Sequence, residues 1–364
     1  MIERDELAAW LRLLETPLVG RDTARRLLAA FGSPQAVFDA PPGALREAAG
    51  AVAGALGRLP PSLAAALETA WQWLAGGERR AVVTLGDPQY PAALVETPDP
   101  PLLLYVQGRA ELLRAVSVAV VGSRNPTPQG LDNARAFARS LSESGLCIVS
   151  GLALGVDGAA HEGALEGQGG TIAVVGTGLD RVYPRRHLAL AHRIAESGLM
   201  VSEYPLGTPP LAGHFPQRNR VIAGLARGTL VVEAALQSGS LITARLAAEC
   251  GREVFAIPGS IHAPQSRGCH ALIRQGAKLV EQAQDILEEL PLEHPVAPGL
   301  PAGPADAAQS PLLQALGFDP VTLDALVERT GMAPALLSVE LLDLELEGRV
   351  ARLPGQLFQR VART

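Results

Sequence analysis

The amino-acid sequence predicts an α/β fold built on an extended, Rossmann-like, doubly wound and mostly parallel sheet. From about Ala81 onwards, apolar runs of strand length alternate with segments of helical periodicity, as in a parallel sheet covered on both faces. The chain has 364 residues, of which 48% are hydrophobic, so it can bury full cores in two or three domains. We also expect a small helical domain before the sheet and a winged helix after it.

The formal net charge of −6 argues against a basic surface, which counts against nucleic-acid binding by the protein as a whole. A local patch can still bind. Lys278 is the only lysine, so the other 30 of the 31 basic residues are arginine, whose planar guanidinium suits phosphates and bases. The charged start of the chain and the lack of an apolar run of about 18 residues predict a cytoplasmic protein without a signal peptide or membrane span.

Metal and cofactor sites are not expected. Cys147, Cys250 and Cys269 lie far apart without a C-x-x-C pair, and the seven histidines show no metal-ligand spacing. A nicotinamide dinucleotide would require G-x-G-x-x-G after the first strand and an acidic residue near the end of the second, and neither is present. We predict reduced cysteines, no metal and no cofactor.

Residues 1 to 77 are predicted to form the helical domain. Its first helix is indicated by apolar residues that share one face, namely Leu7, Trp10, Leu11 and Leu14. Residues 16 to 28 resemble a helix-hairpin-helix, in which a glycine turn offers backbone amides to DNA phosphates. The usual second glycine is replaced around Asp22, so we favour a packing domain over one that contacts DNA directly.

Residues 78 to 290 are predicted to form the sheet domain. Strands are expected at residues 116–121, 146–150, 171–175, 200–203, 229–233 and 253–257. Parallel strands end at one edge of the sheet, and small residues there let a ligand's phosphates approach the backbone. The residues that follow the first three strands include Gly122, Ser123 and Arg124, then Gly151, then Gly176 and Gly178. We therefore predict a phosphate-binding groove at this edge.

Two helix starts are expected to add to the groove. Pro216 suits the first turn of a helix, and the backbone amides of that turn, together with Arg218, Asn219 and Arg220, favour phosphate. A second helix begins with small and hydroxylated residues that form either another phosphate contact or an ordinary cap, namely Ser238, Gly239 and Ser240.

Phe215 precedes the first of these helices and has small or polar neighbours. An aromatic face in such a position can stack on unpaired bases, so we predict that Phe215 is a stacking platform. The alternative is that the ring fills the core beside Val221.

Two pairs of ionisable residues have both a chemical and a structural interpretation. Asp157 and His161 lie one helical turn apart, but no third catalytic group is identifiable, so we favour structural hydrogen bonds. Glu203 and Glu233 end two strands and can act together on a sugar, or can hold Arg220 and helix amides in place. We favour the second role.

Residues 291 to 311 are rich in proline, alanine and glycine and predict a flexible linker. Residues 312 to 364 then predict a winged helix, with three leucine-rich helices and a hairpin centred on Pro354 and Gly355. The third helix is crowded by acidic residues, which argues against its entering the major groove unless another face is used. These residues are Glu340, Asp343, Glu345 and Glu347.

Several short motifs follow one another in a characteristic order between about residues 80 and 290. They are Val-Gly-Ser-Arg at 121–124, Ser-Gly-Leu-Ala at 150–153, Gly-Thr-Gly-Leu-Asp at 176–180, Tyr-Pro at 183–184, Ser-Glu-Tyr-Pro at 202–205, Phe-Pro-Gln-Arg-Asn-Arg at 215–220, Ser-Gly-Ser-Leu-Ile-Thr-Ala at 238–244 and Pro-Gly at 258–259. Together they closely resemble the DNA-processing protein A family, also called Smf. The N-terminal domain is similar to that family's sterile-alpha-motif-like domain.

The resemblance implies a homodimer that binds and protects single-stranded DNA and helps load the RecA recombinase in natural transformation and recombination. It implies no enzymatic activity and no membrane partner. Family members often carry a lysine shortly before the Phe-Pro motif, and residues 211 to 214 contain none. Either Arg185 and Arg186 supply that charge or this protein binds DNA less tightly. Dimer and RecA contacts are assigned by the resemblance to His270, Leu272, Ile273, Arg274, Gln275 and Leu279.

Two other classes of function compete with this one. Nucleoside-monophosphate phosphoribohydrolases use the same broad sheet architecture, but their Pro-Gly-Gly-x-Gly-Thr-x-x-Glu loop corresponds here to residues 234 to 240, which lack the glutamate. An adaptor that binds only proteins is disfavoured by Arg124, Arg218 and Arg220 at one edge of the sheet.

Overall fold

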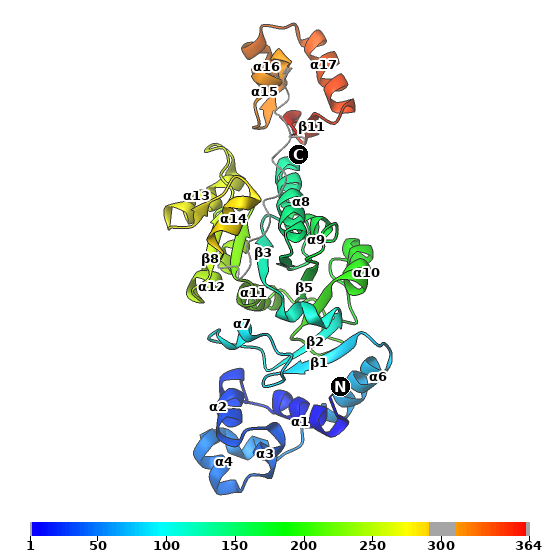
Figure 1. Cartoon of the computed structure of the whole chain (residues 1–364), viewed down its shortest axis with the longest axis vertical. Helices are drawn as coiled ribbons and strands as arrows, with labels where there is room; N and C mark the ends of the chain where they lie inside the picture. Colours follow the sequence, from blue (N-terminus) through cyan, green and yellow to red (C-terminus); the bar gives the residue numbers. More distant parts are fainter. Residues whose placement is uncertain (1, 291–309, 362–364) are drawn as a thin grey trace.

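The computed structural model describes residues 2–290 and 310–361. The molecule is elongated, with helices at the N-terminal end, a helix-covered sheet in the middle and a small C-terminal unit at the other end (Figure 1). The predicted fold class is confirmed. Of the predicted linker, residues 291 to 309 lie outside the described part of the chain. Its last residue, Pro311, begins a helix that Ser310 caps.

The N-terminal helices pack around their own apolar residues and against the edge of the sheet. Leu7 and Leu11 are buried here as predicted, and the ring of Trp73 meets that of Tyr105 edge-on at 6.0 Å. The elements are α1 (Arg4–Glu15), α2 (Arg21–Phe31), α3 (Pro34–Asp39), α4 (Pro42–Ala49), η1 (Gly50–Val52), α5 (Ala53–Leu56) and α6 (Leu63–Ala75).

The central sheet has nine strands in the order β1-β2-β6-β5-β4-β3-β7-β8-β9. Pairing is parallel from β6 to β9, whereas β2 is antiparallel to both β6 and β1. The strands are β1 (Arg80–Thr84), β2 (Leu103–Gly108), β3 (Ser117–Val121), β4 (Cys147–Ser150), β5 (Thr171–Val175), β6 (Leu199–Ser202), β7 (Gly228–Val231), β8 (Glu253–Ala256) and β9 (Lys278–Leu279). Because the order reverses between β3 and β7, a crevice is expected between the ends of these two strands.

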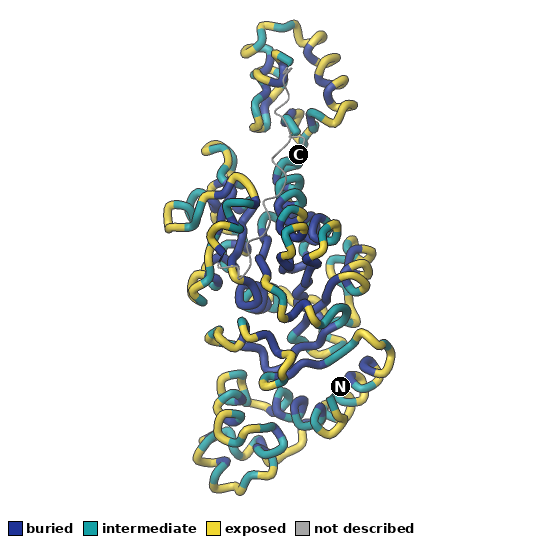
Figure 2. The backbone as a smooth tube through the Cα atoms, in the orientation of Figure 1, coloured by how far each residue is buried: buried dark blue, intermediate teal, exposed yellow. Residues whose placement is uncertain are grey.

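Helices cover both faces of the sheet, and the buried residues follow its strands (Figure 2). Val118 and Val120 pack on one face with α8, α9 and α14, whereas Ala119 and Val121 pack on the other with α11 to α13. The elements are α7 (Ala92–Val95), η2 (Ala110–Arg114), α8 (Pro128–Glu143), α9 (Val156–Ala164), η3 (Arg185–His187), α10 (Leu188–Ser197), α11 (His214–Leu225), α12 (Ser240–Glu249), η4 (Pro264–Ser266), α13 (Arg267–Arg274) and α14 (Ala283–Glu289).

Three predicted strand ends differ from the structure, and two of them concern glutamates; β8 ends at Ala256. β6 ends at Ser202 and β7 at Val231, so Glu203 and Glu233 lie just beyond the strands. The Ser202 hydroxyl donates to the Thr177 carbonyl at 2.6 Å and accepts from the Tyr204 amide, which turns the chain out of the sheet. The Glu203 carboxylate thereby points away from the sheet.

The C-terminal unit has the helices and hairpin predicted for a winged helix, with one additional short strand. Leu316, Leu326 and Leu341 form the centre of its core. Its elements are α15 (Pro311–Leu316), β10 (Val321–Thr322), α16 (Leu323–Thr330), α17 (Pro334–Leu346), β11 (Val350–Leu353) and β12 (Leu357–Arg360), and the strands pair in the order β10-β12-β11. In the described ranges no helix is long and apolar enough to cross a membrane.

Candidate nucleic-acid interface

An open pocket of about 700 Å³ lies where β3 and β7 end, at the point where the strand order reverses. The loop after β3, the start of α11 and the start of α12 form its walls. Most of the predicted groove residues meet in this lining, namely Gly122, Ser123, Arg124, Phe215, Arg218, Asn219, Ser238, Gly239 and Ser240. Residues far apart in the sequence thus converge at the predicted edge.

Phe215 is half-buried and lines the pocket, so it does not fill the core beside Val221. Its ring centroid lies 5.4 Å from that of Tyr183, with a 39° angle between the ring planes. Tyr183 is 48% exposed and was not singled out as a site residue by the sequence. The two rings form one aromatic surface along the pocket wall, suited to contact with an unpaired base.

Arg124 is exposed beside this aromatic surface. Its guanidinium carbon lies 5.8 Å from the centre of the Phe215 ring, and no carboxylate of the described residues forms an ion pair with it. A guanidinium without a paired carboxylate is available for a phosphate oxygen. Arg124 is therefore the predicted arginine whose surroundings fit phosphate binding best.

The start of α12 forms another wall of the pocket. The hydroxyls of Ser238 and Ser240 lie 2.7 Å apart, and Asn219 Nδ2 donates to the Gly239 carbonyl at 3.4 Å. Asn219 also accepts a hydrogen bond from Arg218 Nε at 3.1 Å, so it links α11 to the start of α12. The amides of Ser240, Leu241 and Ile242 already donate to Ser238 and Gly239, so this end of α12 favours an anion through its hydroxyls and the helix dipole.

Arg218 does not reach into the pocket as a free phosphate ligand, which corrects the prediction for this residue. It is only 4% exposed, and Nη1 donates to the carbonyl oxygens of Gly151, at 2.6 Å, and Val174. Burial lowers its pKa to about 10, opposed by the charge of Asp157, so it stays protonated at neutral pH. Arg218 therefore holds the backbone beneath the pocket in place by hydrogen bonds.

Gly151 is required because a side chain there would overlap this guanidinium, 2.2 Å from the position a Cβ would take. Its amide donates to Asp157 Oδ2 at 3.1 Å, and the Ala153 amide donates to the same oxygen at 3.3 Å. Burial raises the pKa of Asp157, while the charge of Arg218 and these amides lower it. The loop after β4 is thus held between α9 and α11.

His161 completes the support of this loop. The Leu152 amide donates to Nε2 at 3.3 Å, Nδ1 lies 2.7 Å from the Thr171 hydroxyl, and that hydroxyl donates to the Ile148 carbonyl. This pattern assigns the proton of a neutral imidazole to Nδ1. Burial lowers the pKa of His161 to about 3, with smaller contributions from His187 and Arg218. The structural hydrogen bonds favoured for Asp157 and His161 are present.

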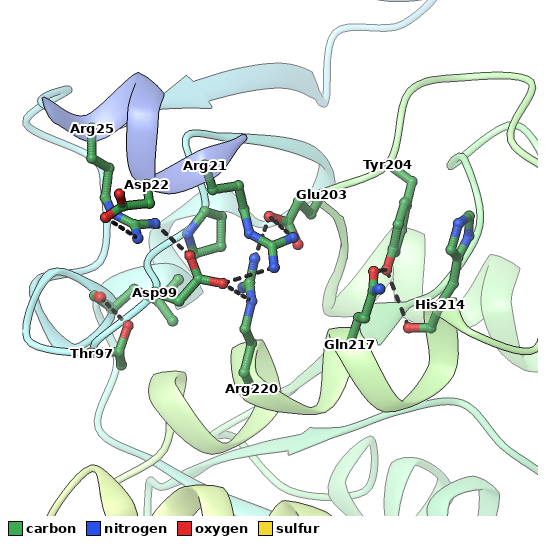
Figure 3. Close-up of polar contacts among 12 residues, drawn as sticks. Arg21, Asp22, Arg25, Thr97, Asp99, Glu203, Tyr204, His214, Gln217 and Arg220 are labelled. Atoms are coloured by element: carbon green, nitrogen blue, oxygen red, sulfur yellow. Dashed lines mark hydrogen bonds and ion pairs between the residues drawn. The ribbon is translucent and has the colours of Figure 1, made fainter. Parts of the chain in front are cut away.

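Arg220 also differs from the prediction, because it lies outside the pocket. Its side chain is 14% exposed and pairs with Asp99, at 3.0 Å, and with Glu203. Arg21 and Arg25 of α2 reach the same Asp99 (Figure 3). Burial opposes ionisation of Asp99, but the hydrogen bond from Arg25 and the charges of Arg220 and Arg21 outweigh it and lower the pKa. Arg220 therefore fixes α11 to the N-terminal helices.

The favoured roles of the two glutamates agree with the structure. Glu203 holds Arg220, and Glu233 accepts from both the amide and the hydroxyl of Thr127, which caps α8. Burial raises the pKa of Glu233, and these hydrogen bonds lower it. The two carboxylates serve different helices rather than forming one pair.

The remaining predicted groove residues lie around the pocket. A Cβ on Gly176 would come within 3.3 Å of the Phe215 ring, so this glycine gives the ring its space. Gly178 instead packs against Asp180 and the Pro205 carbonyl, away from the lining. Arg185 is exposed in η3, two residues after Tyr183.

Sequence reasoning missed Asp99 and Tyr183. Asp99 lies in a proline-rich loop and acquires its role only from arginines on α2 and α11, so no local pattern identifies it. Tyr183 was quoted as part of the Tyr-Pro motif, and its position shortly after the Gly-Thr-Gly-Leu-Asp segment at 176–180 was a signal that could have identified it.

Comparisons with known families give consistent matches along the chain. The model described as DNA recombination-mediator protein A matches residues 81–291. Models described as the DprA-like N-terminal HHH domain and the DprA winged helix domain match residues 4–55 and 296–356.

Individual proteins show the same similarity. Protein Smf of Escherichia coli is 46% identical over 278 residues, which cover 73% of this chain and 74% of that protein. The X-ray structure of DNA processing protein A from Streptococcus pneumoniae is 40% identical, with a TM-score of 0.66, over 80% of this chain and 99% of that one. DNA processing protein A from Helicobacter pylori, whose structure was described for its single-stranded DNA binding mode, is 33% identical, with a TM-score of 0.53, over 58% and 97% of the two chains.

Proposed function

Since this chain belongs to the DNA recombination-mediator protein A family, which includes the proteins called DprA and Smf, we propose that its pocket binds single-stranded DNA. The observation that carries the proposal is the position of the exposed Arg124 beside the rings of Phe215 and Tyr183. The guanidinium binds backbone phosphate, and the rings stack on bases.

The preference for a single strand follows from the aromatic surface. A base in a duplex has its faces covered by its neighbours and cannot stack on Phe215, whereas an unpaired base can. The hydroxyls of Ser238 and Ser240 and the positive end of the α12 dipole add a second anion contact in the same lining as Arg124. The floor beneath them is fixed by Arg218, so the site is formed before DNA arrives.

A salt titration with matched single- and double-stranded oligonucleotides tests this function. We expect tighter binding of the single strand at every salt concentration, and a log affinity that falls linearly with log salt. Equal affinity for the two forms would show that the aromatic surface does not select single strands. No binding of either form at low salt would overturn the proposal and favour an adaptor that binds only proteins.

We further propose that two copies pair through α13 and β9, as the family resemblance implies for the assigned interface residues. Leu272 and Ile273 are half-buried at this edge, and Leu279 on the last strand is 44% exposed. Replacing Ile273 with glutamate should give a folded monomer that binds long single strands more weakly, because linked sites raise the local concentration. A dimer that persists in light scattering would place the interface elsewhere.

The finer biological role is proposed on the same basis. The protein would act in the cytoplasm on incoming single strands during natural transformation and recombination, protect them and load RecA. Exposed residues of the α13 to β9 region, Arg274 and Gln275, are proposed to contact RecA, and His270 lies beside them with its ring 3.0 Å from the Gly259 carbonyl. RecA assembly on single strands should be faster with the wild-type protein than with Arg274→Glu at equal DNA occupancy.

The domain division is also a proposal. Residues 1 to 77, 78 to 290 and 312 to 364 would form three domains, although the N-terminal helices share a core with β1 and β2. Limited proteolysis should then release the C-terminal unit while leaving the first two domains together.

A further inference from the structure

The outer face of α17 in the winged helix is apolar and exposed. Leu336, Val339, Leu342 and Leu346 are 63%, 59%, 54% and 79% exposed, whereas Leu337 and Leu341 on the inner face are buried. Figure 2 shows exposed and buried residues alternating along this helix. Four exposed large side chains on one helix form a continuous strip, which is unlike the scattered apolar residues of an ordinary surface.

The spacing of this strip fits another helix. Ala335, Val339, Leu342 and Leu346, here called the α17 seam, are separated by four, three and four positions, and all are exposed. Residues at alternating intervals of three and four align on one side of a helix and form the apolar contact of paired helices. The inner side of α17 already packs on α16 and β11, so the seam is a second and separate face.

Carboxylates border the seam on both sides. Asp343 follows Leu342 by one position and Glu345 precedes Leu346 by one, so they flank opposite sides of the strip, whereas Glu340 lies further round the helix. All three are exposed, and they have no ion-pair or hydrogen-bond partner among the side chains of the described residues. α17 contains no lysine, arginine or histidine.

This charge pattern indicates which kind of molecule binds the α17 seam. Phosphates of a nucleic acid are repelled by the three carboxylates, although the third helix of such a unit commonly enters the major groove. A second copy of α17 would bring the same carboxylates against one another. A helix with apolar residues on one face and arginine or lysine at its borders satisfies both features of the seam.

We propose that the α17 seam docks a basic amphipathic helix of another protein. Apolar residues of that helix pack on Val339, Leu342 and Leu346, and its cations pair with Asp343 and Glu345. This surface belongs to the C-terminal unit and is separate from the DNA pocket between β3 and β7. The protein thus has one surface for a nucleic acid and another for a protein partner.

Three labelled synthetic peptides of about three heptads each test this proposal in anisotropy titrations with the full chain. One carries leucine at the contact positions and arginine at the borders, the second has glutamate at the borders, and the third has the arginine peptide's composition with its leucines scattered. We expect the arginine peptide to bind tighter than either other peptide by about tenfold or more.

Variants of the chain locate the binding. Leu342→Glu should weaken the arginine peptide by about tenfold or more, whereas Leu59→Glu, at a leucine that is 68% exposed in the N-terminal unit, should leave it unchanged. The double variant Asp343→Lys and Glu345→Lys should weaken the arginine peptide and tighten the glutamate peptide. Unchanged thermal unfolding shows that each variant is folded.

Several results would overturn the proposal. Equal binding of the ordered and scattered arginine peptides would show that they bind by general charge attraction. Undiminished binding of the arginine peptide to Leu342→Glu would show that the binding site lies elsewhere. Loss of self-association in sedimentation experiments on Leu342→Glu would identify a second copy as the occupant. Loss of duplex DNA binding by that variant would identify a nucleic acid instead.

Discussion

Arg218 Nη1 donates to the carbonyl oxygen of Gly151 across 2.6 Å, so the loop after β4 rests on a charged side chain of α11. Arg220, two positions later, points to the other side of the helix and pairs with Asp99. Side chains two positions apart on a helix diverge by about 200°. One helix therefore supports the DNA pocket with one arginine and binds the N-terminal helices with the next.

The role of Arg218 predicts a loss of stability when it is removed. In Arg218→Ala, Asp157 and the carbonyls of Gly151 and Val174 lose their buried cation, so the free energy of unfolding should fall by about 3 kcal/mol. Urea unfolding measures the change. A variant of normal stability whose slope of log affinity against log salt has shrunk by about 0.7 would restore Arg218 as a phosphate ligand.

DNA titrations should distinguish the roles of Arg124 and Arg220. Arg124→Ala should weaken single-strand binding by about 1 to 3 kcal/mol for all base sequences, and the slope of log affinity against log salt should shrink by about 0.7. Arg220→Ala serves as the matched control. It should keep the slope and lose stability, because it leaves Glu203 without its closest partner. A reduced slope in Arg220→Ala alone would reverse these assignments.

His161 predicts a specific dependence of stability on pH. Its folded-state pKa is about 3, below the ordinary value of 6.5, so the unfolded chain takes up the proton first and stability is lost as pH falls below about 6.5. Between pH 6.5 and 5 the wild type should lose about 2 kcal/mol more than His161→Gln in urea unfolding. If the free energy of unfolding changed with pH equally in the two proteins, the imidazole would not be buried in its neutral form.

Asp99 links the N-terminal helices to α11, and its removal should loosen that contact. Asp99→Asn should lower the free energy of unfolding by about 1 kcal/mol at neutral pH and low salt, because Arg21, Arg25 and Arg220 lose a shared anion. Since the Asp99 pKa is lowered, this contribution disappears as pH falls through the folded-state value. Hydrogen exchange in α2 should become faster in the variant. Unchanged exchange would show that apolar packing alone holds the helices.

The contrast between these arginines shows how far the sequence could predict the site. Apolar runs predicted β3 and β5 closely, because a buried parallel strand leaves a continuous pattern. The helix of Arg218 and Arg220 was also predicted. The direction in which each arginine points depends on its partner, Gly151 for Arg218 and Asp99 for Arg220. Both partners are far from α11 in the sequence and come close to it only in the folded protein. Local periodicity carries no information about such distant partners, so Arg218 and Arg220 were both assigned to phosphate.

Phe215 provides the sharpest test of the preference for single strands. Its ring is half-buried, touches Tyr183 and has Arg124 over its face, so it belongs to the pocket wall. Phe215→Ala should weaken single-strand binding by about 1 to 3 kcal/mol and leave duplex binding nearly unchanged, because only unpaired bases stack on the ring. Oligonucleotide titrations and thermal unfolding of the same samples measure both effects.

Tyr183→Ala is the partner variant, because the two rings lie 5.4 Å apart and no base fits between them. They then act as one surface, and the double variant should lose less affinity than the sum of the two single losses. A core role for Phe215 would instead lower the melting temperature by several degrees and preserve the affinity of each folded molecule. In that case discrimination against duplex would have to come from the width of the pocket between Arg124 and the start of α12.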